Sequence, residues 1–322
     1  MADLLTRAQI ELLADLLDAD AAALSSLEHL GAEGVHALRS AISDALFDSL
    51  ASRFALVSKL APIIPNAVVI AVAQKALPPE VSGRAGGAVG LAHEDRAVAV
   101  LSGMKPTYLA DAARYVDPRV IPHFAPKLPA RLLIPTAREL LRRRDYLTAS
   151  RFVEYATEQH IVDFEKAIDD DEGLVRTGAL VSRPDVLNDI LRVAGPDRLV
   201  RMAAAARDGS PELVVAMLSV LDRVEPELAS PAIHELLGNP DTDAVSGILD
   251  VAARDSALAE LLDLAAVLSD EGLRHLAAAP VLHSGSFAKK VGAAADTAAR
   301  RGSWKRLKHA IGAATEPAKA LD

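Results

Sequence analysis

Four consecutive acidic side chains form the densest cluster of metal-binding chemistry in the sequence: Asp169, Asp170, Asp171 and Glu172. Carboxylate oxygens are the ligands that hard cations such as magnesium prefer. The run lacks the ligand spacing of a calcium-binding loop, and an exposed turn between two helices can have the same composition. The sequence therefore offers these residues as a candidate cation site, with a solvated turn as the alternative.

Two histidine motifs are further candidates for metal binding. His160 and Asp163 are three residues apart, so a helix would present them on one face with Glu158 nearby, where they could share a metal or simply be solvated. His234-Glu235 begins like a zinc-protease motif, but the second histidine is missing. The chain has no cysteine, which excludes disulfides, thiol catalysis and cysteine-based zinc sites.

Hydrolase and nucleotide-binding motifs are not present. His283 stands beside Ser284 without a Gly-x-Ser-x-Gly elbow. The glycines at 83, 86, 87 and 90 are not followed by Lys-Ser or Lys-Thr, so we expect them to serve a turn or a close helix contact. We predict no cofactor, and we favour a non-enzymatic protein. Enzymatic activity stays open, because a site assembled across distant helices leaves no local motif.

The segment 105–164 holds seven of the eleven aromatic residues and suggests a ligand- or partner-binding surface. An apolar groove would bind a ligand, and neighbouring arginines would bind a phosphate or an acidic peptide. A simple helix core, with cations at a helix end, is the alternative. The candidate residues are Tyr108, Tyr115, Phe124, Tyr146, Phe152, Tyr155, Arg144 and Arg151.

Short helices must position all of these side chains. Asp117-Pro118 marks one helix start, because aspartate caps free amides and proline suits the first helical position. The next helix begins at Ala130 or at Thr136, where Thr136 and Glu139 form a capping-box pattern. Further starts follow, most of them at intervals of about 10–16 residues. The whole set is Asp95, Thr107, Asp117, Ala130 or Thr136, Asp145, Glu158, Asp171, Ser182, Asp197, Ser210, Glu225, Asp241 and Ser269.

Composition favours an all-α protein. Hydrophobic residues make up 51% and charged residues 25%, which excludes a disordered chain, while only 3% are aromatic. A core of Ala, Leu and Val favours closely packed helices over sheets. Helices this short must stack on neighbours, so we predict a superhelical stack of helical hairpins, a helical-repeat fold. We divide it into an N-terminal helical region (1–77), a repeat domain (78–282) and a basic C-terminal helix with a flexible tail (283–322).

The last 40 residues reverse the sign of the charge. They carry eight Lys or Arg against three acids, in a chain with a net charge of −9. A basic amphipathic helix would contact an acidic partner or an anionic membrane surface, or it would dock on the acidic body of its own chain. The candidate residues are Lys289, Lys290, Arg300, Arg301, Trp304, Lys305 and Arg306. The negative net charge argues against a general nucleic-acid binder.

No stretch of about 20 apolar residues occurs, and acids interrupt the apolar N-terminal run. We therefore expect no signal peptide and no transmembrane helix, and we expect a cytoplasmic location.

Several phrases in the middle of the chain resemble the N-terminal superhelical domain of MgtE-type magnesium transporters: Tyr108-Leu-Ala-Asp111, Val116-Asp-Pro118, Leu128-Pro129 and Ala137-Arg-Glu-Leu-Leu141. The resemblance covers roughly residues 92–206 and implies a stack of short helices. Acidic residues of that domain help to sense magnesium in the family, but no residue here matches one of them. The family's regulatory cystathionine-synthase-type domains and membrane part have no counterpart in this sequence, so the resemblance concerns the fold.

These observations favour a scaffold or regulatory adaptor that binds another protein on a curved surface, with a homo-oligomer as one form of partner. Two alternatives stay open. One is a sensor of a small ligand or divalent cation, using the aromatic groove or the acidic run. The other is a peripheral membrane protein that binds through its basic C-terminal helix.

Overall fold

The computed structural model describes residues 4–60, 63–90 and 93–315, and the side chains of all of these except 50–60, 87–89 and 314–315. Within these ranges every regular element is a helix and no strand occurs, which confirms the predicted all-α class. In the same ranges no helix is both long and apolar enough to cross a membrane.

The chain divides into two compact units. The N-terminal unit contains residues 2–169 with 180–182, and the C-terminal unit contains residues 170–179 with 183 onward. Most of the contacts that hold each helix in place are made within its own unit.

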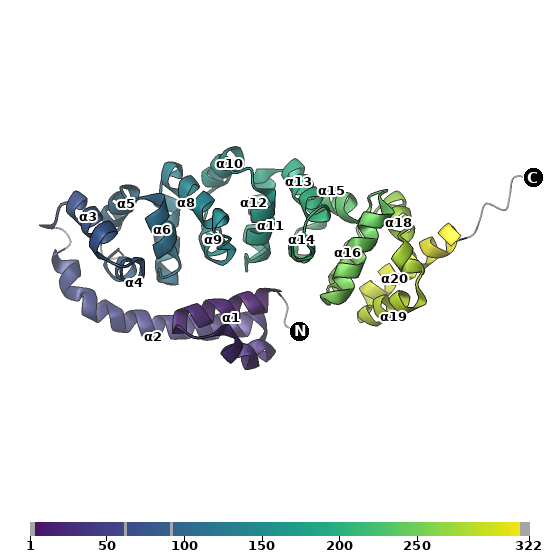
Figure 1. Cartoon of the computed structure of the whole chain (residues 1–322), viewed down its shortest axis with the longest axis horizontal. Coiled ribbons are helices and arrows are strands. Elements are labelled where there is room, and N and C mark those ends of the chain that lie inside the picture. The colour runs from purple at the N-terminus through teal and green to yellow at the C-terminus, as the bar shows by residue number, and fades with distance from the viewer. Residues whose placement is uncertain (1–3, 61–62, 91–92, 316–322) are drawn as a thin grey trace, which may run out of the picture. The chain divides into compact units, whose positions relative to one another are not determined.

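The N-terminal unit begins with two helices joined by a 3-10 segment, and a series of shorter helices follows. Its elements are α1 (Leu4–Leu17), η1 (Ala21–Leu30), α2 (Gly31–Leu60), α3 (Asn66–Ala76), α4 (Pro79–Gly90), α5 (Glu94–Ser102), α6 (Pro106–Ala113), η3 (Pro118–Val120), α7 (Ile121–Phe124), η4 (Ala125–Lys127), α8 (Ala130–Arg142), α9 (Tyr146–Val153) and α10 (Glu158–Ala167). Figure 1 shows α1 lying along α2, and the two share a small core of Ile10, Leu13 and Val35.

Charged contacts join this first helical pair to the rest of its unit. Arg114, just after α6, reaches Asp15 of α1 at 2.7 Å. Arg119 lies 2.8 Å from both Asp48 of α2 and the buried Asp117. These contacts are polar and partly exposed, so each one adds only modestly to stability.

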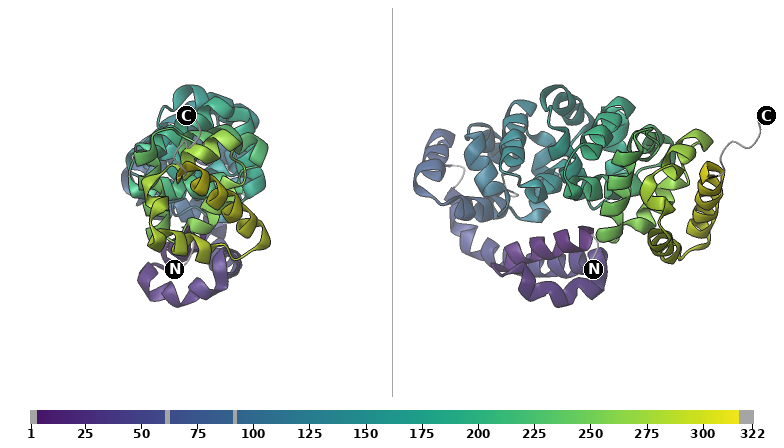
Figure 2. Two further views of the ribbon diagram at one scale, coloured as in Figure 1. Left: turned by 90° about the vertical axis from the view of Figure 1, so that its right-hand side faces the viewer. Right: turned by 45° about the vertical axis from the view of Figure 1, so that its right-hand side comes forward.

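The C-terminal unit is a further run of short helices. Its elements are α11 (Asp171–Ala179), α12 (Pro184–Ala194), α13 (Pro196–Arg207), α14 (Pro211–Arg223), α15 (Pro226–Leu237), α16 (Thr242–Arg254), α17 (Leu258–Ala265), α18 (Asp270–Ala277), η5 (Pro280–His283), α19 (Gly285–Ala294) and α20 (Ala298–Thr315). Figure 2 shows α20 packed beside α18 in two further views. Aliphatic side chains fill the core of this unit, including Leu199, Leu213, Met217, Leu221, Ile233, Leu236, Leu249 and Leu261.

Several helices begin after a side-chain cap and others begin with a proline, and each predicted start, apart from the alternative at Thr136, lies within two residues of an observed one. Ser210 and Asp241 accept hydrogen bonds from the first-turn amides of α14 and α16. Of the two starts proposed for α8, the structure has Ala130. The Thr136 hydroxyl donates to the carbonyl of Leu132 at 2.8 Å, so it forms no capping box. The sequence missed α17, whose preceding residue Ala257 supplies no side-chain cap.

The glycine-rich segment forms α4, and two of its glycines permit close contact with aromatic neighbours. A Cβ on Gly83 would lie 2.6 Å from the carbonyl oxygen of Ala112 and 2.9 Å from the Cβ of Tyr115. A Cβ on Gly90 would lie 2.5 Å from the ring of the buried Phe124. The structure thus supports the expected role of these glycines in close helix contact.

The substitution Gly83→Ala should destabilise the protein by about 1–3 kcal/mol, because the new methyl group would overlap backbone atoms that cannot move aside. Gly86→Ala in the same helix is the control, since nothing lies within 4 Å of its Cβ position. There the loss of backbone freedom in the unfolded chain should stabilise by about 0.5–1 kcal/mol. Urea unfolding of both variants checks this, and equal effects would contradict the proposed close contact.

Candidate functional site

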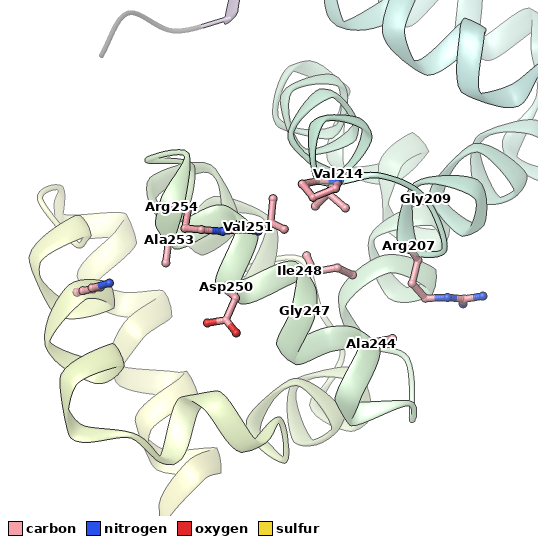
Figure 3. Close-up of a pocket in the computed structure, with 12 residues that line it drawn as sticks. Arg207, Gly209, Val214, Ala244, Gly247, Ile248, Asp250, Val251, Ala253 and Arg254 are labelled. Atoms are coloured by element: carbon pink, nitrogen blue, oxygen red, sulfur yellow. The ribbon is translucent and has the colours of Figure 1, made fainter.

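A pocket of about 630 Å³ opens on the C-terminal unit, between the start of α14, one face of α16 and α19. Figure 3 shows Gly247, Ile248, Asp250, Val251 and Arg254 arranged along α16. The floor is apolar, because Val214, Ile248 and Val251 are all buried.

The sequence of α16 explains how one helix supplies both floor and rim. Asp241 caps the helix by accepting a hydrogen bond from the Ala244 amide at 3.1 Å. Val245, Ile248 and Leu249 then recur at helical spacing and are buried. Gly247 falls on the open side, and nothing lies within 4 Å of the position of its Cβ. The absence of a side chain at Gly247 therefore leaves this part of the pocket open.

Three cations and one acid line the pocket: Arg207, Arg254, Lys290 and Asp250. Arg207 is already engaged by Asp208, 2.9 Å away, and by Glu235. The hydrogen bond that Arg207 donates to Asp208 is the largest of the effects that raise the pKa of Arg207. Arg254 and Lys290 are exposed, and neither has an ion-pair partner among the residues that the structure describes. The rim thus offers two exposed cations without an ion pair in this part of the structure.

The four acidic residues at 169–172 make different contacts and do not form a common site. Asp169 is exposed, and Asp170 accepts a hydrogen bond from the Gly173 amide at 2.8 Å, which caps α11. Asp171 lies 2.8 Å from Nε of the buried Arg198, and Glu172 pairs with Arg176 one turn on. Among the described residues, no three His, Cys, Asp or Glu side chains gather closely enough to hold a metal ion.

Both histidine motifs stabilise helix ends. His160 is buried and forms a capping box with Thr157, whose hydroxyl accepts from the His160 amide at 3.2 Å. The Nε2 of His234 accepts a hydrogen bond from the Ser269 amide at 3.0 Å, at the start of α18. Asp163 is bonded by Gln159 instead of sharing a site with His160.

Three of the six candidate aromatic residues meet α4. The Tyr108 hydroxyl donates to the Ser82 hydroxyl at 2.6 Å, while Tyr115 and Phe124 pack on Gly83 and Gly90. The other three are partly buried on or just after α9: Tyr146, Phe152 and Tyr155. The structure therefore places the six residues in two groups.

The two candidate arginines differ in exposure and in role. Arg144 is exposed and adopts a positive φ of 59° directly after α8, where it ends the helix. Arg151 donates hydrogen bonds to the carbonyl oxygens of Arg114 and Val116, at 3.1 and 2.8 Å. Burial lowers the pKa of Arg151 to about 10. Its guanidinium fixes the turn after α6.

The basic C-terminal segment forms two helices instead of one, and their apolar residues face the protein. Phe287, Val291 and Leu307 are buried, with α20 packed against α17 and α18. Trp304 is partly buried against Gly292. This is the docked arrangement that the sequence left open beside partner and membrane binding.

The cations of this segment are used unequally. Arg300 lies 2.7 Å from Asp263 and 2.9 Å from Asp296. Arg301 donates to the Asp296 carbonyl, and Arg306 donates to the carbonyl of Ala266. The three lysines among the candidate residues stay exposed: Lys289, Lys290 and Lys305. Of all the candidates, only Lys290 lines the pocket.

Sequence reasoning missed the rest of the pocket. Its floor residues follow an ordinary apolar helical pattern, and Arg254 reads as a favourable cation at a helix C-terminus. The one local signal is Gly247, a glycine in the interior of a capped helix, which lowers helix stability without an evident backbone need.

Asp171→Asn should destabilise the protein by about 2–3 kcal/mol, because it removes a negative charge that lies 2.8 Å from the buried Arg198 guanidinium. This loss is somewhat smaller than that expected for a fully buried ion pair, since Asp171 is partly exposed. Glu172→Gln is the matched control in the same turn. Its ion pair is exposed, so we expect a change below about 0.5 kcal/mol. Denaturant unfolding of both variants measures the difference, and equal losses would refute this account of the acidic run.

Arg300→Gln should destabilise the protein by about 1 kcal/mol at pH 7, a modest value for a partly exposed pair. Partial burial of Asp222 is the main effect that raises the pKa of its carboxyl group, and the negative charges of Asp263 and Glu260 raise it further. The positive charge of Arg300 lowers the same pKa. An acid whose pKa is raised in the folded state destabilises the fold when it is ionised. The free energy of unfolding lost in Arg300→Gln should therefore become smaller as the pH falls from about 6 to 4 and Asp222 takes up a proton.

Unfolding at a series of pH values tests this prediction. Arg301→Gln is the control, because Arg301 donates to a backbone carbonyl, so its effect should be nearly independent of pH. A loss that grows toward acid in Arg300→Gln would contradict the electrostatic explanation.

Comparisons with known protein families, with curated proteins and with solved structures find no match to this chain. The likeness to the MgtE N-terminal domain thus stays a resemblance between sequence phrases.

Proposed function

We propose that this chain is a non-enzymatic helical-repeat scaffold that binds another protein, and that the face of α3 is one of its contact surfaces. Nine large hydrophobic side chains are exposed among those described, and six of them lie between residues 63 and 81. They are Ile63, Ile64, Val68, Val72, Leu77 and Val81. This concentration is the observation that carries the proposal.

The spacing of these residues gives the surface its shape. Val68 and Val72 are four residues apart, so they lie on one face of α3 and form an apolar stripe, and the exposed Ile64 lies two residues before the helix begins. Val68 and Val72 are 48% and 46% exposed, and Ala67 and Ala71 are exposed beside them. Lys75 is the only charged residue in α3.

Contiguous exposed apolar surface of this kind marks sites of protein–protein contact in soluble domains. A partner helix laid along α3 would remove the stripe from water, at about 25 cal/mol for each Å² of apolar surface covered. A second copy of this chain would fit the same surface. Because the stripe itself carries no charge, two copies could meet there without placing like charges together.

The succession of short helices supports the same proposal. Helices of mostly 8 to 14 residues follow one another and pack on near neighbours in each unit, as stacked helical hairpins do. Such stacks present extended surfaces instead of a single enclosed cleft. A cytoplasmic location remains part of this proposal.

The alternatives find less support. The carboxylates at 170–172 are occupied by a helix cap and by two arginines, which weakens the case for a cation sensor. A membrane-bound C-terminal helix would need its apolar face free, whereas Phe287, Val291 and Leu307 are buried. We therefore favour the scaffold.

Photo-crosslinking in cells of the source organism tests this function. A benzoylphenylalanine placed at Val68 or Val72 should form adducts of protein size with a partner or with a second copy of the chain. The same group at Gly86 is the control, since this position is exposed and open but lies outside the stripe. Adducts that are absent, or equally abundant at Gly86, would overturn the assignment of this surface.

Charge placed on the stripe should remove the contact. With the crosslinker at Ile64, Val68→Glu combined with Val72→Glu should reduce the adduct at least about 10-fold, because it puts two charges into the apolar contact. Both positions are solvent-exposed, so the free energy of unfolding should change by less than about 0.5 kcal/mol per substitution.

A further inference from the structure

We propose that the pocket on the C-terminal unit is a second binding site, which takes an acidic amphipathic segment of a partner protein. An apolar side chain of that segment would rest on Val214, Ile248 and Val251, and a carboxylate would lie between Arg254 and Lys290. The site is independent of the α3 surface, because it belongs to other helices in the other unit.

The floor determines the apolar half of the ligand. Val214 on α14 and Ile248 and Val251 on α16 line the pocket with hydrocarbon, although each side chain is mostly covered by its own core. A volume of about 630 Å³ accommodates more than one side chain and falls within the usual range of binding pockets. An apolar side chain placed there would displace water from a surface that offers it few hydrogen bonds.

The rim determines the charged half. Arg254 on α16 and Lys290 on α19 approach the pocket from two helices. Neither forms an ion pair with a carboxylate of the described residues, and the charge of Arg254 acts on Glu212 only as a minor electrostatic effect. Asp250 is the one acid in the lining, and Arg207 is already neutralised by Asp208 and Glu235. The uncommitted charge is therefore positive, and it favours a carboxylate over an amine.

The open side of the pocket favours a chain segment as the ligand. Gly247 and Asp250 are exposed, and Figure 3 shows the lining residues spread along α16 instead of closing over it. A peptide can enter such a groove from the side and keep its backbone in water. Anchoring side chains at helical spacing are the known mode of recognition for grooves between helices.

A random 12-residue peptide library displayed on phage, selected against the full-length purified chain, tests the chemistry of the ligand directly. We expect the enriched peptides to combine Asp or Glu with Leu, Ile or Phe at a spacing of three or four residues. Enriched peptides that are net basic or lack apolar residues would overturn the proposal, and so would the absence of any enrichment.

The variant Gly247→Leu tests whether the selected peptides bind in this pocket. The new side chain enters open space inside the pocket, and replacing a helical glycine should leave the thermal midpoint unchanged or higher. Peptide affinity, measured by fluorescence anisotropy, should fall at least about 10-fold because the pocket is filled. Gly302→Leu in α20, also in open space, is the matched control and should bind normally. Equal affinity in both variants would place the peptides elsewhere and overturn the proposal.

Charge reversal tests the carboxylate contact separately. Arg254→Glu with Lys290→Glu should weaken acidic peptides by about 10-fold or more, since attraction becomes repulsion at the rim. Lys289→Glu with Lys305→Glu changes the net charge equally at exposed positions outside the pocket and should alter affinity less than about 3-fold. If the two double variants weaken binding equally, only the overall charge matters and the rim contact is refuted.

The two experiments separate this site from the proposed α3 surface. Val68→Glu with Val72→Glu should not change peptide affinity for the pocket, and Gly247→Leu should not change crosslinking at Val68. Either site can therefore fail while the other stands.

Discussion

Most helices of this chain are too short to be stable alone, and this constraint shapes the rest of the structure. α6, α9, α17 and α18 have eight residues each, whereas isolated helices shorter than about 12–15 residues are marginal in water. Each helix must bury a face against its neighbours. In the C-terminal unit that burial is done by Leu, Val, Ala, Ile and Met, with hardly any aromatic side chain.

The same constraint explains why the polar residues that attract attention in the sequence serve structure. A chain of many short helices has many helix ends, and every end leaves backbone amides and carbonyls without partners. His160 and His234 satisfy such groups, Asp170 caps α11, and Arg151 binds two carbonyl oxygens. Arg254 and Lys290 differ from them, since they project from the rim of a pocket and form no ion pair in the described part of the chain.

The two proposed contact surfaces arise from the same architecture but have different chemistry. On α3, the outer face of a helix carries Val68 and Val72 with almost no charge nearby. On α16, a glycine opens the space between neighbouring helices, and cations surround an apolar floor. A scaffold with these surfaces would bind one partner through apolar contact and another through combined apolar and charged contact.

The sequence alone determined the properties that depend on local interactions. The scarcity of aromatic residues favoured helices over sheets, and caps such as Ser210 and Asp241 located helix starts within two residues, because a cap acts on amides next to it in the chain. Local patterns also misled. Thr136 and Glu139 match the sequence pattern of a capping box, but α8 begins six residues earlier, at Ala130. α17 begins without a side-chain cap, so no local pattern marks its start.

Only the tertiary structure decided which residues are buried and which remain free. Val72 and Val214 are the same residue type in similar apolar helices, yet Val72 is exposed and Val214 is covered, because helices distant in sequence pack over one and not over the other. The pocket brings together residues 207 to 290, and only Lys290 among them stood out in the sequence. Burial and pairing depend on contacts between distant segments, and a local motif does not record them.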